Sequence, residues 1–231
     1  DYSEIHSEVR YYVPLERSYE VWSLAVTNYS EKKRELTVTG YAEFTNNSNY
    51  EQDQVNLQYS QYITQTVFRG NRVRQMIHAN LDRLEEGENI DNKNVFNRFF
   101  GLAGADVNSW CGDKESFLGR YHGYNNPEGI ITGKLSNKGN YNENSCGALS
   151  TVLSLAPGET KEITFLVGMK GDAEAGEIVE HYKNCQDVCK RELEELIEYW
   201  HGQLSHFQIR TPSPEFNTMI NTWNAYNCFM T

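Results

Sequence analysis

Amide side chains are concentrated in one short stretch of the sequence, which runs from Asn46 to Gln61 and holds four asparagines and four glutamines. A primary amide offers hydrogen-bond donors and an acceptor together, which suits the hydroxyl groups of a sugar. The same composition is also typical of a solvated loop between two strands. On these residues alone, a sugar-contacting segment and a solvated connection both stay open.

The acidic residues that cluster in sequence form two groups, one in a non-periodic segment at 82–94 and one on the polar face of a helix predicted over 173–204. Hydrolysis or inverting glycosyl transfer needs a carboxylic acid with a raised pKa in a cleft. Neither group has that setting, so we interpret both as solvated surface and predict no catalytic residue in this chain. The first group is Glu85, Glu86 and Glu88, and the second is Glu192, Glu194, Glu195 and Glu198.

The histidines and cysteines do not predict a metal site or a nucleophile. His122 lies in a loop-like segment, Gly119–Tyr124, where a functional role and a plain structural role both stay open. Cys185 and Cys189 lie four residues apart on the predicted helix, a spacing that could hold two metal ligands, but no second ligand pair accompanies them. We therefore predict no metal and no cofactor. The phosphate-binding glycine loop and the Gly-x-Ser-x-Gly motif do not occur either.

The net charge of −11 excludes several classes of partner. A field of this sign repels nucleic-acid phosphates and anionic lipid surfaces, and no basic stripe offsets it. No apolar run approaches the roughly 18–20 residues that cross a bilayer, and the first residues lack the basic and apolar parts of a signal peptide. The five cysteines do not form a disulfide framework, which favours reduced thiols. We therefore expect a cytoplasmic protein that binds neither nucleic acid nor membrane.

Alternation of apolar and polar residues predicts β-strands over most of the chain before Gly171. The runs at 20–28 and 35–45 flank a short polar turn, which predicts a β-hairpin. A second hairpin is predicted around Arg69–Asn71, and a long irregular connection at 122–145. The remaining predicted strands are 8–14, 55–68, 71–81, 95–102, 116–121, 147–155 and 160–168.

After Gly171 the periodicity becomes helical. Ser213 as N-cap, Pro214 in the first turn and Glu215 after it predict a second helix, which runs to the chain end. This helix is apolar over a wide arc, so it needs partners on several sides. Strands followed by helices predict two structural units and not an alternating α/β fold.

Several short segments, taken in their order along the chain, resemble the N-terminal region of glycoside hydrolase family 94, a family of inverting β-glucoside phosphorylases. The longest is Asp113–Tyr121, followed by Pro127 and Gly133. Each piece is weakly specific, and the ordered set is more specific because it covers nearly the whole chain. The other pieces are Tyr12–Leu15, Glu20–Trp22, Val26–Asn28, Ala42–Phe44, Leu155–Glu159 and Met219–Tyr226.

The resemblance implies a mainly β chain. It predicts a large antiparallel β-sandwich at 1–171, N-terminally incomplete, then a helical linker at 172–211 and the first helix of a missing (α/α)6 barrel at 212–231. In the family, inorganic phosphate is a substrate that attacks the anomeric carbon with inversion. The general acid and the phosphate ligands are expected beyond Thr231, so this chain alone is expected to be inactive.

The resemblance also implies a role for Asn56 and Gln58. They match a sandwich segment that binds the acceptor sugar at the active site of the partner subunit in a homodimer. Departures from the cellobiose phosphorylase pattern at Phe44–Ser48 and Asn56–Tyr59 favour a cellodextrin-type enzyme, with chitobiose and cellobiose types as alternatives. The competing prediction is a stand-alone carbohydrate-binding β-sandwich module.

Overall fold

The structure, a computed structural model, describes residues 2–45, 55–78 and 97–230. The chain divides into two compact units, residues 1–189 and 190–231, and each is described by itself. Among the described residues, no helix is long and apolar enough to cross a membrane.

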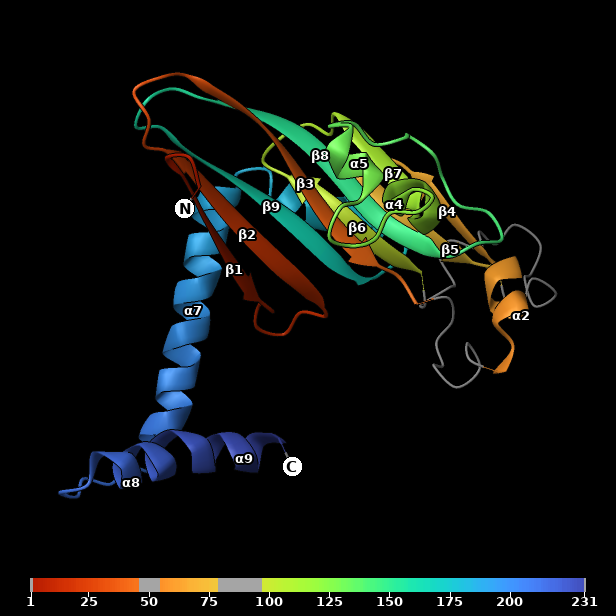
Figure 1. Ribbon diagram of the computed structural model, residues 1–231. Helices are drawn as coiled ribbons and strands as arrows, with labels where there is room; N and C mark the ends of the chain where they lie inside the picture. Colours follow the sequence, from red (N-terminus) through yellow and green to blue (C-terminus); the bar gives the residue numbers. More distant parts are fainter. Residues whose placement is uncertain (1, 46–54, 79–96, 231) are drawn as a thin grey trace. The chain divides into compact units, whose positions relative to one another are not determined.

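The first unit is a sandwich of two antiparallel sheets, which confirms the predicted fold class (Figure 1). Within the described residues one sheet has six strands and the other has three. The order in the first sheet is β1 (Ile5–Tyr12), β2 (Tyr19–Asn28), β9 (Thr160–Met169), β6 (Arg98–Ala103), β5 (Arg72–Ile77) and β4 (Thr64–Phe68). The order in the second is β3 (Arg34–Glu43), β8 (Ser145–Leu155) and β7 (Ser109–Asp113).

Two buried phenylalanine rings fill the space between the sheets. Phe100 of β6 and Phe165 of β9 stack with their ring centroids 5.5 Å apart. The facing sheet carries Gly40 on β3 and Gly147 on β8, and a Cβ at either glycine would lie 2.5 Å from an atom of the facing phenylalanine. The rings therefore lie directly against glycine backbone. The core around them is largely aliphatic: Leu24, Val26, Val73, Leu102, Leu149, Leu153, Leu155 and Ile163.

Several connections carry the chain from one sheet to the other, and two of them meet at Asn28. Residues 29–33 lead from β2 to β3, and residues 156–159 lead from β8 to β9. The hairpin predicted from the runs at 20–28 and 35–45 is therefore wrong, because β2 pairs with β1 and β9 while β3 pairs with β8. Each strand has one strongly apolar side, and the two sides face each other across the core instead of lying side by side in one sheet.

Asn28 joins these two connections and is fully buried. Its Nδ2 donates to the carbonyl oxygen of Lys32 at 2.8 Å in the first connection. The same nitrogen lies 3.1 Å from the carbonyl oxygen of Leu155 and 3.2 Å from that of Ala156 in the second. Its Oδ1 accepts from the backbone nitrogen and the hydroxyl of Ser30. One amide therefore satisfies backbone groups of both crossings.

The hairpin predicted around Arg69–Asn71 is confirmed as β4 and β5. Gly70 and Asn71 have φ values of 52° and 58°, as a tight hairpin turn requires. The strand predicted before this turn is only partly right, because the described residues before β4 form the short helix α2 (Leu57–Tyr62).

The strand predicted at 116–121 is wrong, since this segment begins in the helix α4 (Lys114–Leu118). The strand that the prediction missed is β7, which ends at Asp113 immediately before the helix. Asp113 caps α4 by accepting from the backbone nitrogen of Ser116 at 2.7 Å, so the chain changes from strand to helix at this residue. The connection that follows is irregular apart from α5 (Glu128–Ile131).

Helix α6 (Asp172–His181) lies on the outer face of the six-stranded sheet, where a Cβ at Gly101 of β6 would meet Val179. The helical periodicity predicted over 173–204 is interrupted by a turn and resumes in α7 (Cys185–Ser205). Ala175 and Tyr182 are fully buried, so α6 and the turn after it belong to the packing of the first unit, which extends to residue 189.

A charge cluster fixes the start of α6. Its first residue, Asp172, contacts Arg69 and Arg72, each at 2.5 Å, and Arg74 at 3.3 Å. The Arg74 side chain is only 2% exposed and that of Arg72 only 9%. Burial by itself would raise the pKa of Asp172, but hydrogen bonds from Arg69 and Arg72 and the charge of Arg74 outweigh it and lower the pKa.

The second unit contains the rest of α7 and a helical run from Pro214 to Met230. Ser213 caps this run as predicted, accepting from the backbone nitrogen of Phe216 at 3.3 Å. Trp200 and Phe229 meet edge to face at 4.8 Å. The run is divided into α8 (Pro214–Thr218), a π-helical turn η2 (Met219–Asn224) and α9 (Ala225–Met230).

Candidate functional site

The two residues predicted to bind substrate lie together at the start of α2. Asn56 is its N-cap residue and makes no capping hydrogen bond through its side chain, and Gln58 lies in its first turn. Both residues are exposed. The part of the amide stretch at 46–54 lies outside the described residues. Within the described part, α2 therefore presents two amides to solvent close to one another in the chain.

Two other residues of α2 anchor the helix to the sandwich. Ser60 is buried, and the Gln61 Nε2 donates to Asn144 Oδ1 at 3.1 Å. The loop that holds Asn144 is itself fixed, because Asn140 Nδ2 donates to the Asn144 carbonyl oxygen at 2.9 Å. The composition of the stretch alone does not distinguish its amides from one another. The structure distinguishes Gln61, which holds the helix in place, from Gln58, which does not.

Three tyrosines near α2 are exposed, and sequence reasoning did not single them out. Tyr59 and Tyr62 of α2 are 51% and 71% exposed, and Tyr141 is 65% exposed. Tyr141 lies beside the start of β4, because it forms an isolated antiparallel bridge with Gln65. Exposed aromatic rings interspersed with amides can offer both a flat apolar face and hydrogen-bonding groups, and a sugar ring uses both.

A second polar group is centred on Glu43, at the end of β3. One carboxylate oxygen accepts from the hydroxyls of Tyr41, at 3.0 Å, and Tyr124. The same oxygen lies 3.0 Å from Lys114 Nζ. Burial by itself would raise the pKa of Glu43, but hydrogen bonds from Tyr124, Lys114 and Tyr41 outweigh it and hold the pKa below its ordinary value. Glu43 is therefore suited to accept hydrogen bonds and not to donate a proton.

His122 lines an open pocket of about 920 Å³ beside α4 and α5. Its Nδ1 lies 3.0 Å from the carbonyl oxygen of Asn126, so the exposed ring is tied to its own loop. The pocket also contains Asp113 and Glu143, and a hydrogen bond with Asp113 raises the pKa of Glu143. Glu143 is exposed on a loop, so it lacks the enclosed setting that a general acid needs.

Cys185 and Cys189 face the six-stranded sheet. The Cys185 thiol donates to the carbonyl oxygen of Glu162 at 3.3 Å, and the Cys189 thiol lies 3.4 Å from the hydroxyl of Thr164. Both residues are buried, so the four-residue spacing reflects helix packing. In the part of the chain that the structure describes, no group of three or more histidine, cysteine or acidic residues is arranged to hold a metal ion.

Comparison with known proteins assigns the chain to one family. The family model of the glycosyl hydrolase 94 supersandwich domain matches residues 1–185. An N,N'-diacetylchitobiose phosphorylase of Vibrio proteolyticus is 28% identical over 98% of this chain and 26% of its own length. Its counterpart in Vibrio furnissii is 27% identical over the same shares of both chains.

A 3-O-β-D-glucopyranosyl-β-D-glucuronide phosphorylase of Paenibacillus borealis is 25% identical over 95% of this chain and 27% of its own length. The chain therefore spans about a quarter of the length of these relatives.

Proposed function

This chain belongs to glycosyl hydrolase family 94, whose supersandwich domain model matches residues 1–185. We propose that the chain is the N-terminal part of an inverting phosphorylase that cleaves a β-linked disaccharide or oligosaccharide. The observation that carries the proposal is the family match over residues 1–185, and the phosphorylase names of relatives aligned along nearly the whole chain support it.

The proposed reaction uses inorganic phosphate as a substrate, with no cofactor. A phosphate oxygen forms a bond to the anomeric carbon as the glycosidic C–O bond breaks. A general acid gives a proton to the departing sugar oxygen, and the products are an α-sugar-1-phosphate and a shortened saccharide. We place the acid and the phosphate ligands in the part of the protein beyond Thr231, so residues 1–231 alone do not carry out the reaction.

The role of this chain in the reaction is to form the acceptor end of the sugar site. The exposed amides of Asn56 and Gln58 support this role, because both can donate to and accept from sugar hydroxyls. The hydrogen bond between Gln61 and Asn144 fixes the helix that carries them. In the proposed homodimer, α2 serves the active site of the partner subunit.

Two substrate classes have specific support. The departures at Phe44–Ser48 and Asn56–Tyr59 favour a cellodextrin. The names of the two Vibrio relatives favour N,N'-diacetylchitobiose as the second candidate. The acetamido groups distinguish the two substrates, so a site adapted to one of them discriminates against the other.

The test uses the complete protein that contains this chain. It is incubated with inorganic phosphate and, in separate reactions, cellobiose, cellotriose and N,N'-diacetylchitobiose, and the sugar-1-phosphate is measured. Phosphate-dependent release of an α-linked product from one of them supports the proposal. If the protein binds these saccharides but releases no sugar-1-phosphate from any of them, it is a binding module and the proposal is wrong.

A further inference from the structure

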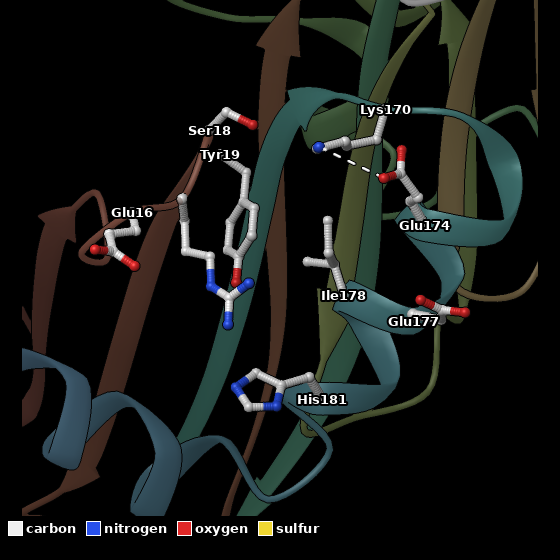
Figure 2. Close-up of a pocket in the computed structure, with 9 residues that line it drawn as sticks. Glu16, Ser18, Tyr19, Lys170, Glu174, Glu177, Ile178 and His181 are labelled. Carbon is white, nitrogen blue, oxygen red and sulfur yellow. Dashed lines mark ion pairs between the residues drawn. The ribbon is translucent and has the colours of Figure 1, made fainter. Parts of the chain in front are cut away.

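A second pocket lies on the outer face of the six-stranded sheet, between the turn that precedes β2 and helix α6. Its volume is about 300 Å³, near the lower end of the range for small-molecule sites. Figure 2 shows Tyr19 of β2 and Ile178 of α6 beside the same space, with Lys170 towards one end and His181 towards the other. The pocket is separated from β4, which follows α2, by β6 and β5 in the sheet order. It is therefore distinct from the site at Asn56 and Gln58.

The floor of this pocket is apolar and firmly held. Tyr19 is 7% exposed, and its hydroxyl lies 3.4 Å from that of the fully buried Tyr182. The two rings also meet edge to face, with their centroids 6.1 Å apart. Ile178 adds an aliphatic side chain from α6. A ligand that enters the pocket therefore meets a small preformed apolar patch, formed by Ile178 and the exposed part of the Tyr19 ring.

The rim of the pocket combines charges of both signs. Arg17 and Lys170 are cationic, and the carboxylates come from Glu16, Glu174 and Glu177. Lys170 Nζ lies 3.7 Å from Glu174 Oε1, so these two charges largely offset each other. The carboxylates disfavour a phosphate or another anion. Donors and acceptors spaced around an apolar floor suit a neutral ring with hydroxyl groups on its edge.

The turn that supplies Glu16 and Arg17 has an unusual conformation. Glu16 has a φ of 58°, which is uncommon for a residue other than glycine. The Arg17 backbone nitrogen donates to the Pro14 carbonyl oxygen at 3.2 Å and closes the turn. Both side chains thus come from a closed turn at the mouth of the pocket.

We propose that this pocket binds a neutral monosaccharide unit, either a free sugar or one residue of an oligosaccharide, with its C–H face on Tyr19 and Ile178 and its hydroxyls on the charged rim. The inference does not depend on the proposed phosphorolysis, because it rests only on the pocket.

The test measures binding to the complete protein, with isoleucine methyl groups labelled for NMR. D-glucose and N-acetyl-D-glucosamine are titrated separately, and inorganic phosphate is titrated as the anionic probe. The Ile178 methyl signal is assigned from an Ile178→Val variant. We expect a saturable shift of this signal with at least one sugar and none with phosphate.

Two variants on the same helix provide the matched comparison. Glu177 lines the pocket, whereas Glu180 lies three residues further along α6 and pairs with Lys183 at 2.9 Å. Glu177→Gln should weaken sugar binding about tenfold, because hydrogen bonds to charged groups are the stronger class. Glu180→Gln should leave the affinity measured from the Ile178 signal unchanged.

Three results would overturn the inference: no saturable Ile178 shift with either sugar, a shift with phosphate alone, or equal affinity in the Glu177→Gln protein. If the protein releases no sugar-1-phosphate but Ile178 responds as expected, the proposed reaction fails and this site stands. If phosphorolysis is found and Ile178 does not respond, the reverse holds.

Discussion

Gln58 and Gln61 lie three residues apart in one helix, yet only Gln58 is expected to act on substrate. If Gln58 binds the acceptor as proposed, Gln58→Ala in the complete protein removes one neutral hydrogen bond, which costs about 0.5–1.5 kcal/mol, roughly three- to tenfold in affinity. The KM for the acceptor sugar in the synthetic direction should rise by about this factor. The KM for the sugar-1-phosphate should change little, because the proposal assigns donor binding to residues beyond Thr231.

Gln186→Ala is the matched control, since Gln186 is an exposed amide on α7. It should change neither KM. Asn56→Ala should resemble Gln58→Ala. If both α2 variants show normal acceptor kinetics, the helix is a solvated connection and the substrate-binding assignment is wrong.

Mixed dimers test whether α2 acts on the partner subunit. In the proposed homodimer of the complete protein, one subunit carries Gln58→Ala with a working form of the expected catalytic barrel, and the other carries an intact Gln58 with an inactivated barrel. If α2 acts across the dimer, the working barrel meets an intact Gln58 and the acceptor KM should be near normal. An acceptor KM that stays raised would show that α2 serves its own subunit.

The charge of Asp172 should matter for stability, because three arginines surround it. Asp172→Asn removes the carboxylate shared by Arg69, Arg72 and Arg74, and should lower the free energy of unfolding by about 3 kcal/mol, at the low end for a broken buried ion pair. Urea unfolding followed by tryptophan fluorescence measures the change. Glu8→Gln is the control, because the Glu8–Arg10 pair is half exposed and should contribute well under 1 kcal/mol.

The same substitution should alter the dependence of stability on pH. The folded-state pKa of Asp172 is lowered, so its contribution is present above the unfolded-state pKa of about 4 and is lost as the pH falls through the folded-state value. The difference in unfolding free energy between the original protein and Asp172→Asn should therefore be largest near neutral pH and shrink below about pH 4. A difference that stays constant into acid would mean that the carboxylate charge is not what stabilises α6.

At the scale of elements, the close approach of the two sheets depends on glycine. Gly40→Ala places a Cβ 2.5 Å from the Phe165 ring, and overpacking of this kind costs about 1–3 kcal/mol. Thermal or urea unfolding should show this loss. Gly202→Ala is the control and should lose no stability, because nothing outside the backbone of its own helix lies within 4 Å of the added Cβ. If the Gly40→Ala protein is as stable as the original protein, Phe165 can move away at no cost, and its stacking on Phe100 does not hold it in place.

The sequence predicts the positions of the strands better than it predicts which strands pair with one another. Alternation identifies β2 and β3 because it depends on local burial, but it cannot tell which sheet each strand joins, since an apolar face fits either arrangement. The turn residues Gly70 and Asn71 do identify the hairpin of β4 and β5, because the required backbone conformation is local.

The candidate site was only partly predictable, for the same reason. Asn56 and Gln58 were predicted through the resemblance, because their local sequence alone left a solvated loop open. The hydrogen bond that anchors α2 joins Gln61 to Asn144, 83 positions further along the chain. The bridge between Gln65 and Tyr141, which places Tyr141 beside β4, is also long-range. No periodicity in one segment reports such a contact.

At the scale of the molecule, the second unit carries many exposed apolar side chains. Phe216, Met219, Trp223 and Phe229 are between 48% and 63% exposed. Large exposed apolar surfaces favour association, so purified residues 1–231 should self-associate, and sedimentation should detect it. Residues 1–189, which follow the boundary of the first unit, should associate less. Monomeric behaviour of both proteins would contradict the argument.

The same preparation tests where the chemistry lies. Residues 1–231 should release no more sugar-1-phosphate from cellobiose, cellotriose or N,N'-diacetylchitobiose than a control preparation from cells that lack the gene. Release above that level would place a catalytic acid within this chain.

The burial of Asn28 has a consequence for how the protein can be produced. Asn28, Tyr29 and Ser30 form an Asn-x-Ser acceptor sequence for N-glycosylation. In the fold, the amide nitrogen that would carry the glycan already donates to backbone carbonyls, and Asn28 has no exposed surface. Secretion from a eukaryotic host would thus set glycan transfer to the nascent chain in competition with closure of the sandwich. Molecules that receive the glycan would be unable to bury Asn28, whereas bacterial cytoplasmic expression avoids that competition.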